Sequence, residues 1–259
     1  ISFLPIFLLI VCVNPRYIIR FSYVAFILSI ALLISVFIIG DVSMGARRWI
    51  NLGLFKFQPS EISKIITVLA IARYYHFLKE HLTERLKYSF LPFLIILSQI
   101  AFILKQPDLG TSLTILLIGI SVIFLAGLKF RYFIVTAIIG LLMVPIVWGK
   151  LHDYQQQRIK TFLNPEEDVL GTGYNIIQAK IAIGSGGIFG KGAFAGTQGT
   201  LDFLPESHTD FAFTIFAEQY GFLGCLVLLS IYGLLIIWGM RIGLKSESHL
   251  IRLASSGIT

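Results

Sequence analysis

Two long stretches without a charged residue dominate the hydrophobic pattern of this chain. They are Phe21 to Gly40 and Leu109 to Leu128. Folded as an α-helix, each stretch would be about 30 Å long, which matches the hydrocarbon core of a bilayer. Two such stretches in one chain predict a helical protein that crosses the membrane more than once.

Weaker apolar segments predict further helices. Apolar residues fill Ile1–Val13, Phe90–Leu104, Phe133–Gly149 and Phe222–Met240, and a more polar candidate runs from Ser60 to Phe77. We therefore expect about seven helices in an all-α, polytopic transmembrane helix bundle, as a single domain over residues 1–259. No basic region precedes Ile1–Val13, so we interpret it as the end of a helix cut by a fragment boundary rather than as a signal peptide.

Composition supports this fold class and narrows the range of partners. Apolar residues make up 56% of the chain and charged residues 14%, whereas soluble domains have about 25% charged residues. A chain with so few charges cannot cover a surface that faces water, so membrane lipid must surround it. The net charge of +7 is typical of basic cytoplasmic loops. Because the chain has no basic-aromatic motif for nucleic acid, we expect no nucleic-acid partner.

The loops between the expected helices differ in charge. Short loops on one side are basic, whereas residues 150–210 hold five Lys and Arg against seven Asp and Glu. The positive-inside rule makes this stretch a large extracytoplasmic loop before the penultimate group of helices. The loop Asp41–Gln58 is an exception, because it carries Arg47, Arg48 and Lys56 on the same outer side. Either it binds an anionic substrate there, or it is a simple exception to a statistical rule.

The long outer stretch contains structural signals of its own. Asn164-Pro165-Glu166-Glu167 has the form of a helix start, and Tyr174–Ile183 predicts a short helix. Glycines then break the pattern from Gly184 onward, and they permit close backbone approach and turns with positive φ. The residues around Lys191 lack the spacing of a phosphate-binding Walker loop, so we expect no nucleotide cofactor.

Charged residues interrupt the apolar pattern near the expected helix ends. Glu61 and Lys64 lie three residues apart on one helix face, either as an interfacial anchor or as a pair that faces a polar cavity. Lys105 and Asp108 lie in a tight turn between two spans. Asp108 there either caps the next helix or has a functional role.

His208 and Asp210 end the outer stretch, directly before an apolar helix. The dipole at the start of that helix stabilises a carboxylate, and an ionised Asp beside a His suits a general base. Spacing alone leaves a helix cap and a general base equally open for Asp210. Glu218 follows two turns later and is expected to face the bundle interior. The sequence has no Ser-His-Asp order and no His/Cys metal cluster, so a nucleophilic hydrolase and a zinc enzyme lose support.

Five segments together resemble the motifs of one known family. They are Gly45–Trp49, Phe57–Lys64, Gln106–Thr111, Gly173–Gly184 and Leu204–Phe211. In this order they resemble the SEDS family (shape, elongation, division and sporulation), and the similarity runs over essentially the whole chain. The runs Tyr174–Gln178 and Gly196–Gln198 look like the elongation branch, RodA, rather than the division branch, FtsW.

The resemblance implies an enzyme of the bacterial inner membrane that polymerises lipid II into peptidoglycan strands on the outer face. The family's essential Asp matches Asp210, and its polar cavity positions match Glu61, Lys64 and Asp108. Arg48 matches the Arg of the family's Gly-Ala-x-Arg-Trp motif. Compared with the family, the chain would lack the first and the last two helices. The implied partners are lipid II, a class B penicillin-binding protein and the rod-shape (elongasome) proteins.

This function would assign a role to each charged group. A GlcNAc 4-hydroxyl would attack the anomeric carbon of the lipid-linked donor with inversion, and Asp210 would take the hydroxyl proton. The leaving undecaprenyl pyrophosphate needs cations, and a divalent ion (Mg or Mn) would assist them. Candidates that would contact the substrate, besides Glu61 and Asp108, are Arg48, Lys64, Lys105, Lys191 and His208. Two rival functions stay open: a transporter that flips lipid II, and a scaffold that only recruits the penicillin-binding protein.

Overall fold

The computed structural model describes residues 15–43, 46–51, 53, 56–149, 151, 153–168, 172–192 and 211–259. The chain divides into two compact units. Ile1–Val135 and Trp238–Thr259 form the first unit, and Thr136–Ile237 form the second. The single domain expected from the sequence stays a prediction.

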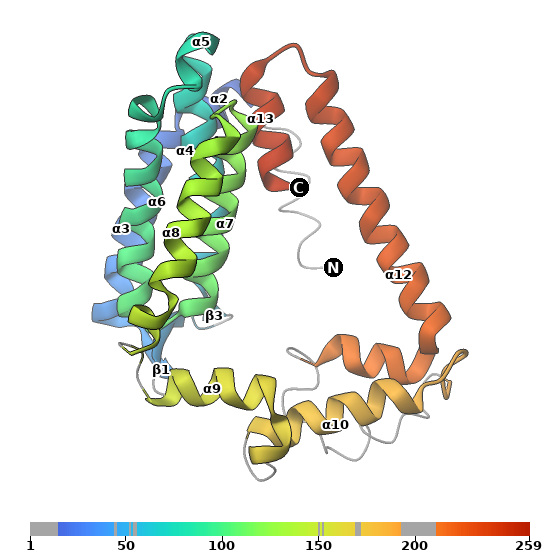
Figure 1. Cartoon of the computed structure of the whole chain (residues 1–259). Helices are drawn as coiled ribbons and strands as arrows, with labels where there is room; N and C mark the ends of the chain where they lie inside the picture. Colours follow the sequence, from blue (N-terminus) through green and yellow to red (C-terminus); the bar gives the residue numbers. More distant parts are fainter. Residues whose placement is uncertain are drawn as a thin grey trace. The chain divides into compact units, whose positions relative to one another are not determined.

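A polar helix lies at the centre of the first unit. This helix, α4 (Pro59–His76), packs against α3 (Ser22–Ile39), α6 (Phe90–Lys105), α7 (Leu109–Leu125) and α13 (His249–Ile258) (Figure 1). Its buried face carries Ser63 and Thr67, whose hydroxyls donate to the carbonyls of Pro59 and Ser63 at 3.1 and 2.7 Å. Because these polar groups have partners within their own helix, α4 can be buried among apolar helices.

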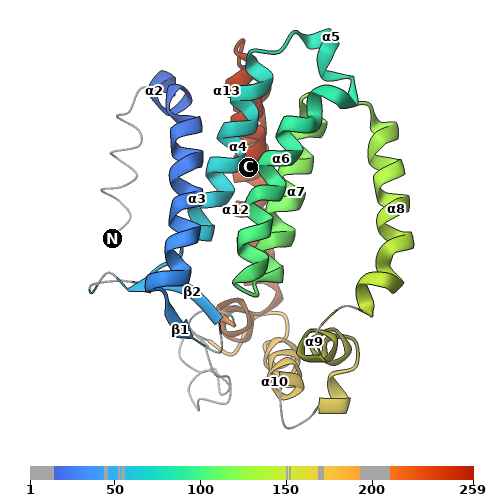
Figure 2. The same ribbon diagram turned by 90° about the vertical axis from the view of Figure 1, so that its left-hand side faces the viewer.

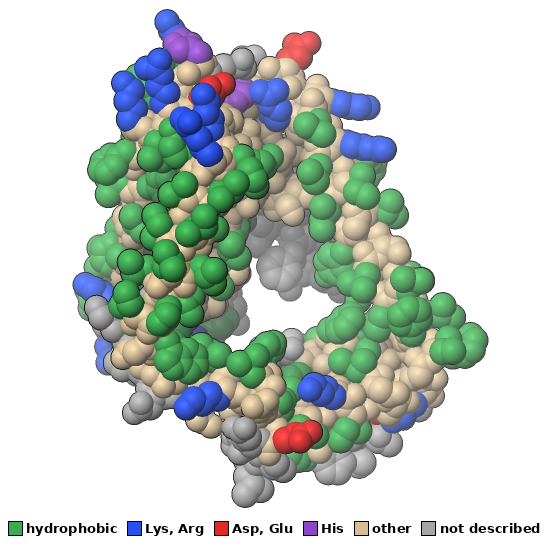
Figure 3. Space-filling view, viewed as in Figure 1, with side chains coloured by type: hydrophobic (Ala, Val, Ile, Leu, Met, Phe, Trp, Pro, Cys, Tyr) green, Lys and Arg blue, Asp and Glu red, His purple; other side chains and the backbone are tan. Residues whose placement is uncertain are grey.

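The outer helices have the length and apolar surface of membrane spans. Ser22–Ile39, Leu86–Lys105 and Ala212–Lys245 (α12) are long enough to cross a bilayer, and α7 and α8 (Phe130–Trp148) are shorter apolar helices. Hydrophobic side chains cover the helices of the first unit (Figure 3), as expected where lipid replaces water. The all-α, multi-pass fold class is therefore confirmed. The expected helix Ile1–Val13 lies outside the described residues.

A small antiparallel sheet follows α3, where the sequence indicated only a loop. β1 (Asp41–Ser43) pairs with β2 (Ala46–Asn51), which pairs with β3 (Lys56–Phe57). The last strand leads into Pro59, the first residue of α4. We call this end of the first unit, with the sheet and the turn 105–108, the sheet end; Figure 2 shows β1 and β2 at the end of α3 far from α5.

The opposite end of the first unit, here called the basic end, carries α2 (Pro15–Arg20), α5 (Glu80–Thr83) and the 3-10 turn η1 (Leu86–Ser89). Lys, Arg and His side chains gather there (Figure 3). Glu84 Oε2 lies 2.9 Å from Lys129 Nζ. The hydrogen bond from Lys129, together with its positive charge, lowers the pKa of the Glu84 carboxyl. This ion pair links the α4–α6 connection to the turn between α7 and α8.

The second unit contains α9 (Asp153–Leu163), a 3-10 turn η2 (Pro165–Asp168) and α10 (Thr172–Ser185), with the adjoining parts of α8 and α12. α10 confirms the predicted short helix. A 3-10 helix begins at Pro165, where the pattern Asn164-Pro165 predicts a helix start, and it is described as far as Asp168. The backbone N–H of Asn164 donates to the Lys160 carbonyl at 2.8 Å and closes the last turn of α9, a helix that the sequence analysis did not predict.

Candidate active site

Arg48 joins two distant segments at the sheet end. It extends from β2, and its Nε donates to the Gln106 carbonyl at 3.3 Å, while its Nη2 donates to the Pro107 carbonyl. The same Nε lies 4.0 Å from Oδ2 of Asp108. The Arg48 side chain is 31% exposed and that of Asp108 11%. One guanidinium therefore holds the sheet against the α6–α7 turn and faces a largely buried carboxylate.

Asp108 is the N-cap of α7. Its Oδ1 accepts a hydrogen bond from the Thr111 N–H at 3.1 Å, and its Oδ2 accepts one from the Thr111 hydroxyl at 2.8 Å. The cap satisfies a backbone donor that the helix leaves unpaired, and the helix dipole favours the charged carboxylate. Asp108 thus serves as a helix cap and also as the charge partner of Arg48.

Gln106 completes this turn, although the sequence analysis did not single it out. Its side chain is buried, and its Nε2 donates to the Leu33 carbonyl at 3.0 Å, which ties the turn to α3. In the sequence, nothing distinguishes a buried Gln between Lys105 and Pro107 from an exposed turn residue. Lys105 itself lies exposed in the last turn of α6.

Glu61 and Lys64 form an ion pair in the first turns of α4, with 2.8 Å between Oε2 and Nζ. Both residues line a cavity of about 300 Å³. Its other walls come from α4, α7 and α13, namely Ile65, Val68, Ile118, Gly257 and Ile258. Because a Cβ at Gly257 would collide with the Val68 and Val122 side chains, glycine lets α13 approach both helices here.

The second unit holds another ion pair. Lys191 Nζ lies 2.7 Å from Oε1 of Glu218, whose side chain is fully buried, while that of Lys191 is 30% exposed. Glu218 is therefore buried, but against the turn after α10 in the second unit, and the position expected for it in the bundle interior stays a prediction. Its pairing with Lys191 could not be predicted from sequence spacing, since the two residues lie on different elements. Asp210 and His208 lie outside the described residues.

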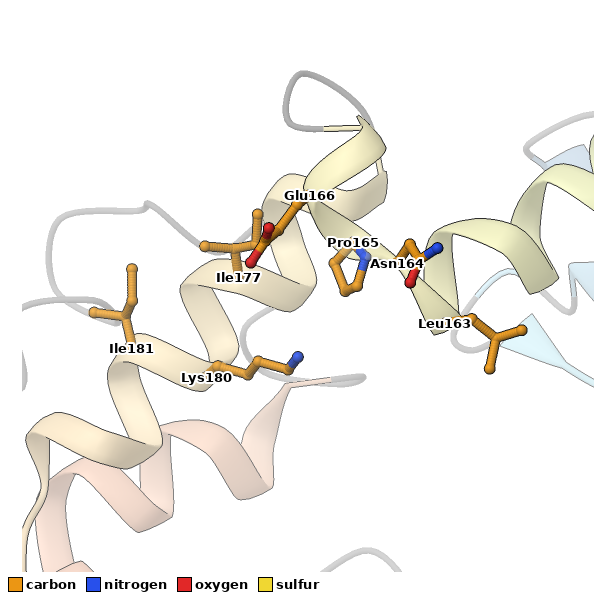
Figure 4. A pocket seen from close by; sticks show the side chains of 7 residues that line it. All are labelled: Leu163, Asn164, Pro165, Glu166, Ile177, Lys180 and Ile181. Atoms are coloured by element: carbon orange, nitrogen blue, oxygen red, sulfur yellow. The ribbon is translucent and has the colours of Figure 1, made fainter.

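A cavity of about 490 Å³ in the second unit lies where α9, η2 and α10 meet. Figure 4 shows its lining, in which Glu166 and Lys180 stand among apolar side chains from α9 and α10. The sequence pattern had not indicated this cavity.

A divalent ion is expected from the chemistry of a pyrophosphate leaving group. Within the described part of the chain, no group of three His, Cys, Asp or Glu side chains could hold a metal ion. Residues 193–210, which include Asp210, lie outside that part of the chain, so the divalent ion stays a prediction and no reaction step is derived through it.

The whole chain, residues 1–259, matches the family model of the cell cycle proteins FtsW, RodA and SpoVE. The chain belongs to this family. It is the SEDS family that the sequence motifs resemble, so the resemblance is confirmed. The family assignment rests on the full length of the chain rather than on one motif.

Two curated SEDS relatives show how much of a family member this chain represents. It is 44% identical over 234 residues to the peptidoglycan glycosyltransferase MrdB of Escherichia coli strain K12, covering 90% of this chain and 63% of MrdB. It is 41% identical over 220 residues to a probable peptidoglycan glycosyltransferase FtsW of Thiomicrospira cyclica, covering 83% of this chain and 55% of FtsW. The chain therefore spans less than two thirds of the length of these relatives.

Solved SEDS structures have the same fold. A chain of a peptidoglycan synthase complex, studied for the coordination of polymerization and crosslinking, superposes with a TM-score of 0.80 at 31% identity, covering 96% of this chain and 69% of that one. The crystal structure of the rod shape determining protein RodA of Thermus thermophilus gives a TM-score of 0.64 at 26% identity, covering 95% and 64%. Both likenesses extend over nearly the whole chain.

Proposed function

We propose that the protein to which this chain belongs is a peptidoglycan glycosyltransferase that polymerises lipid II during cell elongation. The observation that carries the proposal is the 44% identity to MrdB along 90% of this chain. The described geometry agrees with it, because charged side chains gather at the sheet end, beyond the apolar middle of the helices, where a lipid-linked anion could meet them.

The proposed location is the bacterial inner membrane, with residues 150–210 on the extracytoplasmic side. The basic end of the first unit would then face the cytoplasm, in agreement with the positive-inside rule. This orientation puts Arg48 and its neighbours on the outer side. The positive charge of the loop Asp41–Gln58 would then serve to bind an anionic substrate.

The proposed reaction needs one general base. Asp210 accepts the proton of the acceptor GlcNAc 4-hydroxyl while the oxygen forms a bond to the anomeric carbon of the donor. The bond from that carbon to the pyrophosphate breaks, and its electron pair leaves with undecaprenyl pyrophosphate. Attack opposite the leaving group inverts the carbon, so no covalent enzyme intermediate is required. His208, two residues before Asp210, would bind substrate beside the base.

Cations at the sheet end would stabilise the leaving pyrophosphate. Arg48 and Lys64 are held in place by Asp108 and Glu61 before substrate arrives, so little reorganisation is needed. A pyrophosphate carries more negative charge than a carboxylate and would compete with these partners for the two cations. Lys105 is exposed in the last turn of α6 and could reach toward the same anion.

The proposed partners follow from the same chemistry. Lipid II lies in the bilayer that surrounds the apolar helices, so the substrate reaches the sheet end by lateral diffusion. A glycan strand must also be crosslinked, which suggests a class B penicillin-binding protein and the rod-shape machinery as partners. One family member has been solved within a peptidoglycan synthase complex.

The test uses the full-length protein, purified in detergent and given fluorescent lipid II. We expect glycan polymers that lysozyme digests and that are absent from a preparation without the protein. A full-length protein that makes no polymer, yet moves lipid II across vesicle membranes, would be a transporter. If it does neither but still binds the penicillin-binding protein, it is a scaffold.

A further inference from the structure

The turn after α10 is interlocked with a break in α12. Four backbone hydrogen bonds, with N···O distances from 2.9 to 3.1 Å, join residues 187–192 to residues 218–223. Two of them run from Lys191 and Gly192 to α12, and two run back from Phe222 and Leu223. Because both segments donate and accept, neither can move without breaking bonds to the other.

Glycine is required on both sides of this junction. Gly190 has a φ of 80° and Gly221 a φ of 65°, a region that residues with a Cβ rarely adopt. A Cβ at Gly190 would collide with the backbone of Gln219, and a Cβ at Gly221 would collide with the backbone of Gly190 and Ile188. The two segments therefore approach as closely as two backbones can.

The ion pair between Lys191 and Glu218 spans the same junction. The distance from Nζ to Oε1 is 2.7 Å, and the Glu218 side chain is fully buried. Removing the charge partner of a buried carboxylate strongly destabilises the folded protein. The ammonium of Lys191 therefore holds the start of α12 against the end of the α10 turn by charge as well as by backbone hydrogen bonds.

The two segments joined at this junction lie before and after residues 193–210 in the sequence. Lys191 lies just before that segment, and Glu218 lies in the helix that begins two residues after Asp210. We propose that Lys191 and Glu218 are positioning residues, whose ion pair orients the helix start next to Asp210 for catalysis. The inference rests on the proposed function. In this proposal Lys191 acts through Glu218 rather than directly on the pyrophosphate.

The two roles of Lys191 predict different coupling to Glu218. A cation that stabilises the leaving pyrophosphate and a residue that positions the reacting groups both contribute to kcat, so a loss of kcat excludes only a role in ground-state binding, which would raise KM. The ion pair also predicts coupling between its partners. Once Lys191 is gone, neutralising Glu218 removes a buried charge that has lost this ion pair, so the second substitution should add little to the loss caused by the first.

The experiment measures steady-state polymerisation by the full-length protein carrying Lys191→Ala, Lys191→Arg, Glu218→Gln or the double change Lys191→Ala with Glu218→Gln. We expect Lys191→Ala to lower kcat at least tenfold with KM changed less than twofold. Lys191→Arg should keep at least a third of the wild-type kcat, and the double variant should be no slower than Lys191→Ala. Lys160→Ala, a matched loss of one exposed Lys on α9, should leave both constants unchanged.

A second readout does not depend on activity. Hydrogen–deuterium exchange should be at least tenfold faster in residues 186–192 and 217–223 of Lys191→Ala than in wild type, and unchanged in Lys160→Ala. A raised KM at constant kcat, additive losses in the double variant, or unchanged exchange would each overturn the positioning role. A wild-type protein that makes no polymer contradicts the proposed function instead, and the exchange data then decide whether the pair holds the junction.

Discussion

At the sheet end, Arg48 and Asp108 each make more than one polar contact. Asp108 caps α7 through Thr111, and Arg48 reaches it from a strand while also holding two carbonyls of the α6–α7 turn. Each residue therefore has a structural contact and a charge that could face substrate. Substitutions can separate the two contributions, because the cap needs only an acceptor, whereas the binding of an anion needs the positive charge.

Replacing Arg48 with Ala should weaken lipid II binding about tenfold, since one charge-assisted interaction contributes about 1.5 kcal/mol. Arg47→Ala is the matched control, because Arg47 is the exposed neighbour and donates to the Phe37 carbonyl instead. Binding of fluorescent lipid II to the full-length protein in detergent measures both. Unchanged affinity in Arg48→Ala would mean that Arg48 does not bind substrate and that this basic loop is only an exception to the positive-inside rule.

Replacing Asp108 with Ala should reduce stability by about 1 kcal/mol, the typical loss for a helix N-cap. Asp108→Asn should retain most of this stability, because an amide oxygen can still accept from the Thr111 N–H. Thermal unfolding of the full-length protein in detergent compares the two. Equal melting temperatures for Asp108→Ala and wild type would show that the cap contributes nothing there.

Among the elements, the apolar helices could be predicted and the polar ones only in part. α3, α6 and α7 coincide with uninterrupted apolar runs, whose length alone requires a helix in lipid. α9 was missed because its polar run from Gln155 to Gln157 has no apolar stretch of that kind. The three strands were missed as well, since strands of two to six residues leave little pattern to detect.

The break in α12 at Gly221 depends on the absence of a side chain. Gly221→Ala should lower the melting temperature of the full-length protein by several degrees, because a Cβ there meets a positive φ and the backbone of Gly190. Gly233→Ala is the control in the same helix, where a Cβ would meet nothing within 4 Å. A Gly221→Ala protein as stable as the control would contradict the close backbone approach.

For the whole molecule, charge distribution predicts orientation, while contacts between distant residues could not be derived from the sequence. Lys191 and Glu218 are 27 residues apart and lie on different elements, so no spacing rule connects them. The same holds for Arg48 and Asp108, which meet only after the sheet folds against the α6–α7 turn. The candidate residues could thus be named from their motifs, but their pairing required the fold.

Orientation is testable with single cysteines in a full-length variant whose native cysteines are replaced. Lys56→Cys, on exposed β3 at the sheet end, should react with a membrane-impermeant maleimide in intact cells whose outer membrane is permeable to it. Lys87→Cys, exposed at the basic end, should react only after the inner membrane is opened. The reverse pattern of labelling would mean that the sheet end faces the cytoplasm.

The most direct test of the central claim is polymerisation of fluorescent lipid II by the full-length protein with Asp210→Asn. Asn keeps the size of the side chain but cannot accept the hydroxyl proton as a carboxylate does. We predict a loss of at least about a hundredfold in polymer formation, the lower range for removal of a general base, while lipid II binding stays within twofold of wild type. Polymer formation at the wild-type rate would contradict Asp210 as the base.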